Sequence, residues 1–335
     1  MGGEDGGEGP DHLVLFIAAA AAGLVACAAL PVRAAEIVEL SLPAPLTEIR
    51  KSPDGVFAVV GDEVFRLLAC QAAAGICLET TRDAGIAEKA PSGALPDGFI
   101  AKTAAGDIRE AWYARPTRRY PHGALGDEIE GGSLVVRTAQ GRRLEFVLPD
   151  TAVFEDITPR IADLDGDGAN EVVTIRSSRS GGAAVAIYGI EGGDLVERGS
   201  GTENGRPNRW LNIAAIMPGD DGVQTIFAVR TPHIGGRLFS LRYQDGDVVE
   251  QNDIAGDISN HAFGSREQAL SAVADFDGDG APDLVLPSQD RATLRFPLSD
   301  LPGIVLPEPV DMALAAVGGR IVTGTRDGTL LVISP

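Results

Sequence analysis

Two copies of one acidic loop constrain the fold of this chain more than any other feature. Residues 162–173 read ADLDGDGANEVV, and residues 274–285 read ADFDGDGAPDLV. In each copy three aspartates occupy alternate positions and a fourth acid follows, although carboxylates this close together repel one another. A stretch that is unfavourable by itself and still recurs indicates a repeated structural unit.

The two loops lie within a longer repeat of strand-like segments. The dipeptides Asp167-Gly168, Asp221-Gly222 and Asp279-Gly280 align, and a β-type run precedes each of them at 157–163, 211–217 and 270–276. After each dipeptide come a second, a third and a weaker fourth run of the same type. Four short strands per roughly 50 residues, repeated along the chain, are typical of β-propeller blades.

Both ends of the chain fit this scheme. The C-terminus provides the runs MALAAV, RIVTGT and TLLVIS and then stops, while EIVELSL at 36–42 can supply the missing fourth strand. Pairing the first and last strands would remove exposed sheet edges. The sequence therefore predicts an all-β fold in which residues 36–335 form a single β-propeller of about six four-stranded blades. The count is seven if residues 83–108 hold a further blade.

Two regions near the start of this domain differ in regularity. Residues 46–82 read as the first blade. Residues 83–155 read as an irregular second blade with an insertion, RPTRRYPHGALGDEIEGG. We expect this insertion between the first and second strands of its blade, on the same side as the acidic loops.

The acidic loops have the chemistry of a Ca²⁺ site. Ca²⁺ takes six to eight oxygen ligands, mostly carboxylate and carbonyl, and glycine permits the sharp turn that aims them at one point. The alternative is an acidic, solvated turn that binds no ion. An EF-hand is excluded, because position 12 is Thr174 or Leu286 and the following residues are strand-like. The expected ligands are Asp163, Asp165, Asp167, the Ala169 carbonyl and Glu171 in one loop, and Asp275, Asp277, Asp279, the Ala281 carbonyl and Asp283 in the other.

The pattern D-x-D-x-D-G-x-x-[DE] between two strands resembles the FG-GAP/VCBS repeats of integrin-type propellers and their bacterial relatives. The resemblance covers the loops at 163–171 and 275–283, a degenerate copy at 219–222 and, by periodicity, most of residues 36–335. It implies two structural Ca²⁺ sites. The degenerate copy has Met217 and Thr225 where acids are needed, so we expect no calcium there.

Propeller topology also predicts where a ligand would bind. The loops that join the second to the third strand of a blade, and each blade to the next, lie opposite the acidic loops. Loops on a rigid scaffold commonly carry recognition groups, and arginines can bind carboxylates or phosphates bidentately. The structural alternative is a tryptophan that covers a blade junction, arginines in local ion pairs and histidines bonded to carbonyls. The candidate residues are Arg206, Asn208, Arg209, Trp210, His233, Asn260, His261 and Arg266.

The N-terminus is predicted to be an export segment. Residues 13–30 form an uninterrupted apolar run, and small residues suited to cleavage follow near Ala34 and Ala35. Residues 1–35 therefore read as a signal peptide or an N-terminal membrane anchor. The sequence LVAC at 24–27 also resembles a lipoprotein box with Cys27 as the lipidated residue. Each alternative places the bulk of the chain in the periplasm or outside the cell, unless the acidic leader inverts an anchor.

Cysteine usage agrees with export. Cys70 and Cys77 flank a short turn in CQAAAGIC, where they could form a disulfide in an oxidising compartment. The alternative is a pair of buried thiols.

Composition limits the function classes. A net charge of −20 speaks against nucleic acid or an anionic membrane surface as the main partner. Sequence motifs for a nucleophile elbow, a zinc protease or a phosphate-binding loop are missing. We therefore expect an exported, calcium-binding module for a protein partner or an anionic glycan. The alternatives are a propeller lyase or hydrolase acting on a polyanion, and an envelope scaffold attached through residues 13–30 or Cys27.

Overall fold

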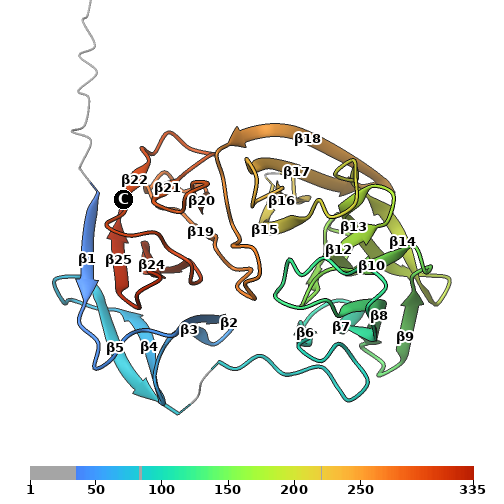
Figure 1. The fold of residues 1–335 in the computed structure, drawn as a ribbon, viewed down its shortest axis with the longest axis horizontal. Coiled ribbons are helices and arrows are strands. Elements are labelled where there is room, and N and C mark those ends of the chain that lie inside the picture. Colours follow the sequence, from blue (N-terminus) through green and yellow to red (C-terminus); the bar gives the residue numbers. More distant parts are fainter. Residues whose placement is uncertain (1–34, 83–84, 220) are drawn as a thin grey trace, which may run out of the picture. The chain divides into compact units, whose positions relative to one another are not determined.

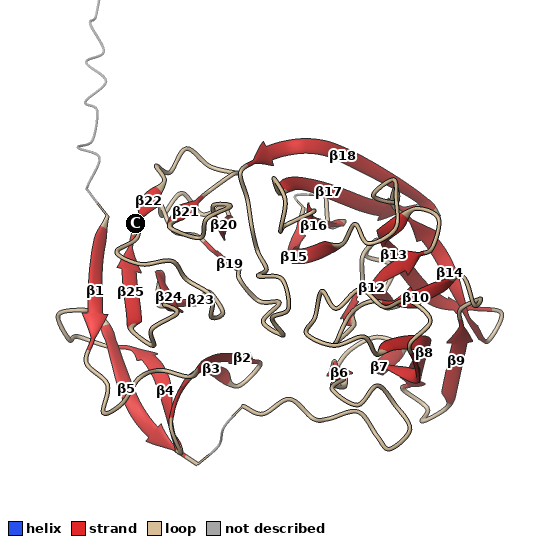
Figure 2. Ribbon diagram, viewed as in Figure 1, coloured by secondary structure: helices blue, strands red, loops and turns tan. Residues whose placement is uncertain are grey.

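A computed structural model describes residues 35–82, 85–219 and 221–335. These ranges contain strands, turns and loops and no helix, as Figure 2 shows. None of their elements is therefore a helix long and apolar enough to cross a membrane. The predicted signal peptide, anchor and lipidated Cys27 all concern residues outside the described ranges.

The first sheet confirms the predicted first repeat. Its four antiparallel strands follow one another in chain order. A disulfide joins Cys70 and Cys77 just after the third of these strands and within the fourth, with 5.8 Å between their Cα atoms. The disulfide prediction is confirmed, and the alternative of two buried thiols is wrong. The strands are β2 (Glu48–Ser52), β3 (Gly55–Val60), β4 (Glu63–Ala69) and β5 (Ile76–Thr81).

The next two predicted repeats share one nine-stranded sheet. A short strand, β10, pairs with both β8 and β12 and so joins the strands β6–β9 to the strands β11–β14. The strands are β6 (Ala101–Lys102), β7 (Ile108–Thr117), β8 (Glu130–Thr138), β9 (Arg143–Val147), β10 (Ala152–Phe154), β11 (Arg160–Ala162), β12 (Glu171–Ser178), β13 (Gly182–Glu191) and β14 (Asp194–Ser200).

The predicted place of the insertion within this sheet is wrong. The insertion connects β7 to β8, which are the second and third strands of their group, because the two-residue strand β6 precedes them. In a sheet of consecutive antiparallel strands, the connections lie alternately at the two ends of the strands, and we call these two ends the edges of the fold. The insertion therefore lies at the edge opposite the acidic loops, not beside them.

Two further four-stranded sheets follow, and each keeps its strands in chain order. Their first strands are each followed by one of the aligned acidic or degenerate loops. The strands are β15 (Leu211–Pro218), β16 (Gln224–Arg230), β17 (Arg237–Gln244) and β18 (Asp247–Gly256), and then β19 (Ala272–Ala274), β20 (Asp283–Pro287), β21 (Thr293–Arg295) and β22 (Ile304–Val305).

The last sheet combines both ends of the described chain. β1 (Glu36–Leu40) pairs with β25 (Leu330–Ser334), and β24 (Arg320–Gly324) and β23 (Ala315–Val317) complete the order β1-β25-β24-β23 (Figure 1). The register runs from Glu36 opposite Ser334 to Leu40 opposite Leu330. The prediction that residues 36–42 supply the missing fourth strand is confirmed.

The core lies between neighbouring sheets. Val173 and Ile175 of β12 share one buried cluster with Ile226 of β16 and Leu241 of β17, so apolar side chains from two sheets meet there. Similar contacts join β15 to β19, β19 to β23 and β2 to β24. Full burial of one such aliphatic side chain contributes about 1.5–3 kcal/mol. These interfaces hold the loops at the two sheet edges in fixed positions.

Candidate functional site

The first acidic loop connects β11 to β12 and is organised by its own amides. Asp163 accepts hydrogen bonds from the amides of Gly166 and Gly168, at 2.8 and 3.0 Å. The amide of Ala169 donates to Asp167 at 2.7 Å. Gly166 and Gly168 have φ values of +79° and +88°, a backbone region that favours glycine. The glycines therefore allow the turn, and the turn positions the carboxylates.

The second loop, between β19 and β20, repeats this arrangement atom for atom. Asp275 accepts from the amides of Gly278 and Gly280 at 2.6 and 3.0 Å, and Ala281 donates to Asp279 at 2.7 Å. Two segments more than 100 residues apart in the sequence thus form the same hydrogen-bond pattern. This shared pattern shows that the loops are equivalent units of a repeat.

The acid that closes each loop is buried. Glu171 accepts a hydrogen bond from the amide of Leu164 at 3.0 Å, and Asp283 accepts one from the amide of Phe276 at 2.8 Å. Burial, reinforced by the charges of the loop aspartates, raises the pKa of Glu171 to about 7. A cation between these groups would relieve the repulsion that raises this pKa.

Carboxylate oxygens converge in both loops closely enough to hold a metal ion. One group consists of Asp163, Asp165 and Asp167, and the other of Asp275, Asp277 and Asp283, with the oxygens of each group within 4.8 Å of one another. Of the predicted ligands, the carboxylates of Glu171 and Asp279 lie outside these groups. The donor set contains only oxygen, which suits a hard cation.

The degenerate third loop, between β15 and β16, has a cation supplied by the protein. Asp221 forms a 2.5 Å ion pair with Arg242, which lowers the pKa of that carboxyl. Arg242 lies on β17 directly opposite Thr225, one of the positions where the other loops have an acid. A guanidinium therefore neutralises Asp221 in this loop.

Both acidic loops have neighbours that sequence reasoning did not identify. The side chain of Asn170 donates to the carbonyls of Ala105 and Ile108, and Gln224 donates to the carbonyl of Asp163 at 2.7 Å. The first loop is therefore bonded to segments on both sides of it. A cavity of about 480 Å³ adjoins the second loop, where Asp300 adds a further carboxylate to its lining.

At the opposite edge, Trp210 is an internal residue. Only 2% of its surface is exposed, its ring stacks on His233 at 5.7 Å, and the ring of His261 meets it edge-on at 4.5 Å. Its Nε1–H donates to the carbonyl of Glu155 at 2.9 Å. Trp210 thus packs the loops together, which corresponds to the structural alternative for this residue.

His233 and His261 form a hydrogen-bonded pair. The Nε2–H of His261 donates to the carbonyl of Ser265 at 2.9 Å, and its Nδ1 lies 2.8 Å from Nε2 of His233. Burial lowers the pKa of His233 to about 4 and that of His261 to about 3, so both rings are neutral at pH 7. His233 therefore donates to His261. Asn260 is also fully buried and donates to the carbonyl of Asn212 at 3.3 Å.

One exposed part of this edge is the arginine loop, residues 201–210, which connects β14 to β15. Arg206 and Asn208 are exposed and Arg209 is half-buried. Within the described ranges, neither guanidinium has an ion-pair partner. The backbone is held in place, because Asn208 donates its amide to the Tyr120 hydroxyl at 2.7 Å and Ala183 donates to the Arg209 carbonyl at 2.9 Å.

Arg266 differs from the arginines of this loop. It forms ion pairs with Asp97 and with Asp127, the latter at 2.7 Å. Asp127 belongs to the insertion. Arg266 therefore ties the insertion to the segment before β19, and its charge is neutralised.

Sequence reasoning missed a buried polar pair at this edge. His122 of the insertion donates its Nδ1–H to Oε1 of Glu155 at 2.5 Å, and the other carboxylate oxygen accepts from the Ser177 hydroxyl. Glu155 is fully buried, and within the described ranges no group bonds to Nε2 of His122. The His122 ring lies 5.9 Å from that of Phe263. The pair was not predicted, because the insertion was expected at the other edge.

Glu130 lies in the same acidic neighbourhood. It is 2% exposed, and burial, together with the charges of Glu155, Asp127 and Asp156, raises its pKa to about 9. Glu130 is therefore a neutral carboxylic acid at pH 7.

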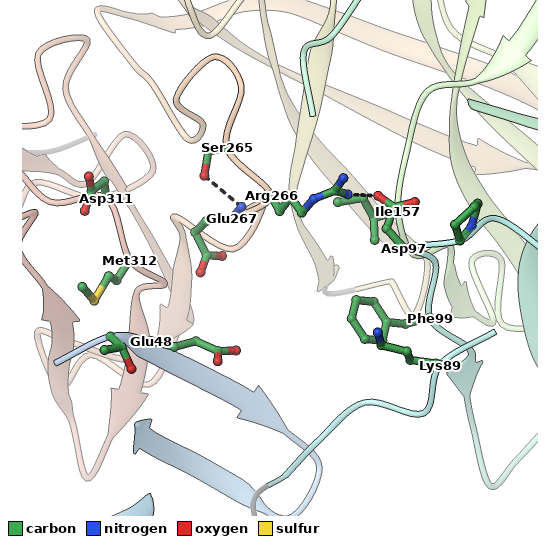
Figure 3. Close-up of a pocket in the computed structure, with 12 residues that line it drawn as sticks. Glu48, Lys89, Asp97, Phe99, Ile157, Ser265, Arg266, Glu267, Asp311 and Met312 are labelled. Carbon is green, nitrogen blue, oxygen red and sulfur yellow. Dashed lines mark hydrogen bonds and ion pairs between the residues drawn. The ribbon is translucent and has the colours of Figure 1, made fainter. Parts of the chain in front are cut away.

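A separate cavity of about 720 Å³ is lined by segments next to β2, β11, β19 and β23 (Figure 3). Four acids line it, and each has a protein partner. Glu48 pairs with Arg50, Asp97 with Arg266 and Asp311 with Arg326. Glu267 accepts the amides of Ala269 and Ala313. Oδ1 of Asp97 is the exception among these carboxylate oxygens, because it is buried without a hydrogen-bond partner among the described residues.

Comparisons with known proteins do not assign a family. The sequence matches no family model, and no curated protein is significantly similar to it. Similar solved structures include the exotype rhamnogalacturonan lyase YesX (TM-score 0.44, 14% identity, 88% of this chain and 51% of that one). The rhamnogalacturonan lyase PL11 of Bacillus licheniformis has a TM-score of 0.42 and 13% identity, with 84% of this chain and 64% of that one covered. BamB from Moraxella catarrhalis has a TM-score of 0.29 and 12% identity, with 90% of this chain and 98% of that one covered. The chain spans about half the length of YesX, and likenesses this distant support no argument about its function.

Proposed function

We propose that the chain is an exported, calcium-stabilised β-propeller that binds an anionic ligand at the edge opposite its calcium loops. The propeller has six blades of four strands. The groups β2–β5, β6–β9, β11–β14, β15–β18 and β19–β22 are followed by β23–β25, which β1 completes. The repeat pattern and its loops support a relationship to FG-GAP/VCBS proteins.

Calcium is the cation that suits the two acidic loops best. Their oxygen-only donors, flexible glycine turns and exposed positions match extracellular calcium modules, which bind at roughly 10⁻⁴ to 10⁻³ M. At about 1 mM Ca²⁺ and the tight end of this range, each site contributes about 1.4 kcal/mol of stability. The disulfide between Cys70 and Cys77 supports an oxidising, extracytoplasmic location.

The observation that carries the ligand proposal is the unpaired charge of Arg206 and Arg209. Many arginines of the described chain form ion pairs with acids, as Arg176 does with Glu197 and Arg230 with Glu250, while others, such as Arg66 and Arg320, form none. Arg206 and Arg209 are unpaired among the described residues and lie in the same loop, so in a chain of net charge −20 they are available together to an anion from outside. Carboxylate or phosphate groups would be held bidentately by these guanidinium groups.

Binding of polyanions tests this proposal. Calorimetry with poly-L-glutamate and with polygalacturonate, at low salt and 1 mM Ca²⁺, should show saturable binding. The double variant Arg206→Ala/Arg209→Ala should bind about tenfold or more weakly. The control double variant Arg137→Ala/Arg143→Ala also removes two charges, from residues paired with Glu110 at 2.9 Å and with Glu145 at 3.1 Å, and should bind normally. Equal loss in both variants, or no binding at all, would contradict the proposal.

A second candidate is an enzyme that acts on a polyanion at the same edge. The observation in its favour is the imidazole of His122, whose Nδ1 is fixed by a buried carboxylate while Nε2 has no partner among the described residues. A histidine oriented in this way can act as a general base. Turnover of polygalacturonate or of another polyanion that is lost in His122→Gln, with binding retained, would favour this candidate.

A further inference from the structure

We infer that the anionic ligand is an acidic protein segment with an apolar side chain, and that it docks on Phe263 and Ile234 beside the arginine loop. This inference rests on the proposed function, because it specifies the ligand of the same edge. A binding comparison of three polyanions distinguishes the failure of this inference from the failure of the proposed function.

Phe263 and Ile234 are unusual among the large apolar residues of the described chain. They are 60% and 66% exposed, whereas most such residues are buried. A single exposed apolar side chain is ordinary, but two on loops that contact each other near unpaired charge resemble the centre of a protein interface. His233 links the two, since Ile234 follows it in the sequence and its ring lies 5.2 Å from that of Phe263.

Contacts connect this apolar pair continuously to the arginine loop. Asn208 donates to the hydroxyl of Tyr120 at 2.7 Å, and the Tyr120 and His122 rings are 6.3 Å apart. The His122 ring in turn meets Phe263 at 5.9 Å. A second route runs from Trp210, at the end of the arginine loop, through His233. The loops that carry the charged and the apolar residues are therefore packed together at the same edge of the fold. We call the residues that they present the docking surface: Arg206, Asn208, Arg209, His122, Phe263 and Ile234.

The Phe263 ring is held in place before any ligand binds. His122 and His233 contact it edge-on, with interplanar angles of 66° and 85°. Glu155 fixes the first of these histidines and His261 fixes the second. The amide of Gly264 also donates to the carbonyl of Ala124 at 2.9 Å. An aromatic anchor that is already ordered loses little entropy on binding, which favours affinity.

The side chains of the docking surface fit a protein segment better than a glycan. A sugar ring can stack on the face of Phe263, but the aliphatic side chain of Ile234 adds nothing to such stacking and suits an apolar side chain of a peptide. A peptide with carboxylates and an apolar residue satisfies both the arginines and the exposed apolar pair. Its N–H or hydroxyl groups could also donate to the unbonded Nε2 of His122.

Three polyanions matched in length distinguish these ligand classes. They are poly-L-glutamate, a random copolymer of glutamate and tyrosine, and polygalacturonate, each titrated into the protein at 1 mM Ca²⁺ and fixed low salt. The copolymer should bind about tenfold more tightly than poly-L-glutamate, because its rings add apolar contacts that outweigh its smaller number of carboxylates. The variant Phe263→Ser/Ile234→Ser should lose this advantage and keep its melting temperature. The control Val305→Ser, at a residue that is 73% exposed, should keep the advantage.

The other results overturn the inference. Equal affinity for poly-L-glutamate and the copolymer, or an advantage that survives in Phe263→Ser/Ile234→Ser, would show that no apolar docking occurs. Tighter binding of polygalacturonate than of the copolymer would assign the surface to glycans. In these cases binding that still depends on Arg206 and Arg209 leaves the proposed function standing. If none of the three polyanions binds, the proposed function fails and the inference fails with it.

Discussion

His122 and Glu155 are joined by a 2.5 Å hydrogen bond that ties the insertion between β7 and β8 to the edge opposite the acidic loops. The same carboxylate accepts the Ser177 hydroxyl, and the carbonyl of Glu155 accepts the Trp210 ring N–H. One buried residue thus connects the insertion, β12 and the arginine loop. The loops that carry the docking surface are therefore bonded to one buried residue and are not independent of one another.

The buried carboxyl of Glu130 predicts a dependence of stability on pH. Its pKa of about 9 in the folded protein lies above the ordinary 4.5, so the folded state keeps a proton that the unfolded chain releases. Its contribution to stability is therefore full below pH 4.5 and is lost as the pH rises toward 9. The advantage of Glu130→Gln over the natural protein should grow by up to about 1.4 kcal/mol per pH unit between pH 5 and 8. Urea unfolding measures it.

Glu128→Gln provides the matched control for this measurement. Glu128 is exposed and pairs only loosely with Arg118, at 3.5 Å. Its difference from the natural protein should stay flat with pH. A flat difference for Glu130→Gln as well would show that Glu130 is ionised in the folded state.

The neutral pair of His233 and His261 predicts the opposite pH dependence, a loss of stability as the pH falls. Burial holds the pKa of His261 at about 3 and that of His233 at about 4, whereas both take up a proton near 6.5 once unfolded. Their contribution to stability is complete above pH 6.5 and is lost as the pH falls toward 4. His261→Gln should therefore lose less stability than the natural protein between pH 6.5 and 4.5, by about 1 kcal/mol per pH unit at most. Urea unfolding of both proteins in chelator measures this difference. A difference in the free energy of unfolding that stays constant between pH 6.5 and 4.5 would contradict the prediction.

Gly182 sets the position of the arginine loop. Its φ is +78°, and a Cβ atom there would lie 2.3 Å from the Arg206 carbonyl oxygen and 2.8 Å from that of Arg209. Gly182→Ala should cost about 2 kcal/mol or more and weaken polyanion binding, because the loop must move. Gly141→Ala, in the turn between β8 and β9, has a similar φ of +79° with nothing within 4 Å, so it measures the backbone strain alone. Similar losses of binding in both variants would exclude a role for the contact.

Sequence periodicity predicted the strands and their closure well. The pairing of β1 with β25, the Cys70–Cys77 disulfide and the equivalence of the two acidic loops all follow from local patterns. A two-residue strand such as β6 has no periodicity to detect, and missing it displaced the insertion to the wrong edge. The burial of His261 and the bond between His122 and Glu155 depend on contacts between distant segments, which one sequence does not reveal.

Calcium binding tests the central claim most directly. Residues 36–335 should be titrated with Ca²⁺ by calorimetry beside Asp167→Ala and Asp279→Ala, and melting should be followed in calcium and in chelator. We expect two sites, one lost in each variant, and a rise in melting temperature with calcium in the natural protein. Absence of binding, or binding that leaves the melting temperature unchanged, would mean that the acidic loops are ordinary turns and would contradict the account of a calcium-stabilised propeller.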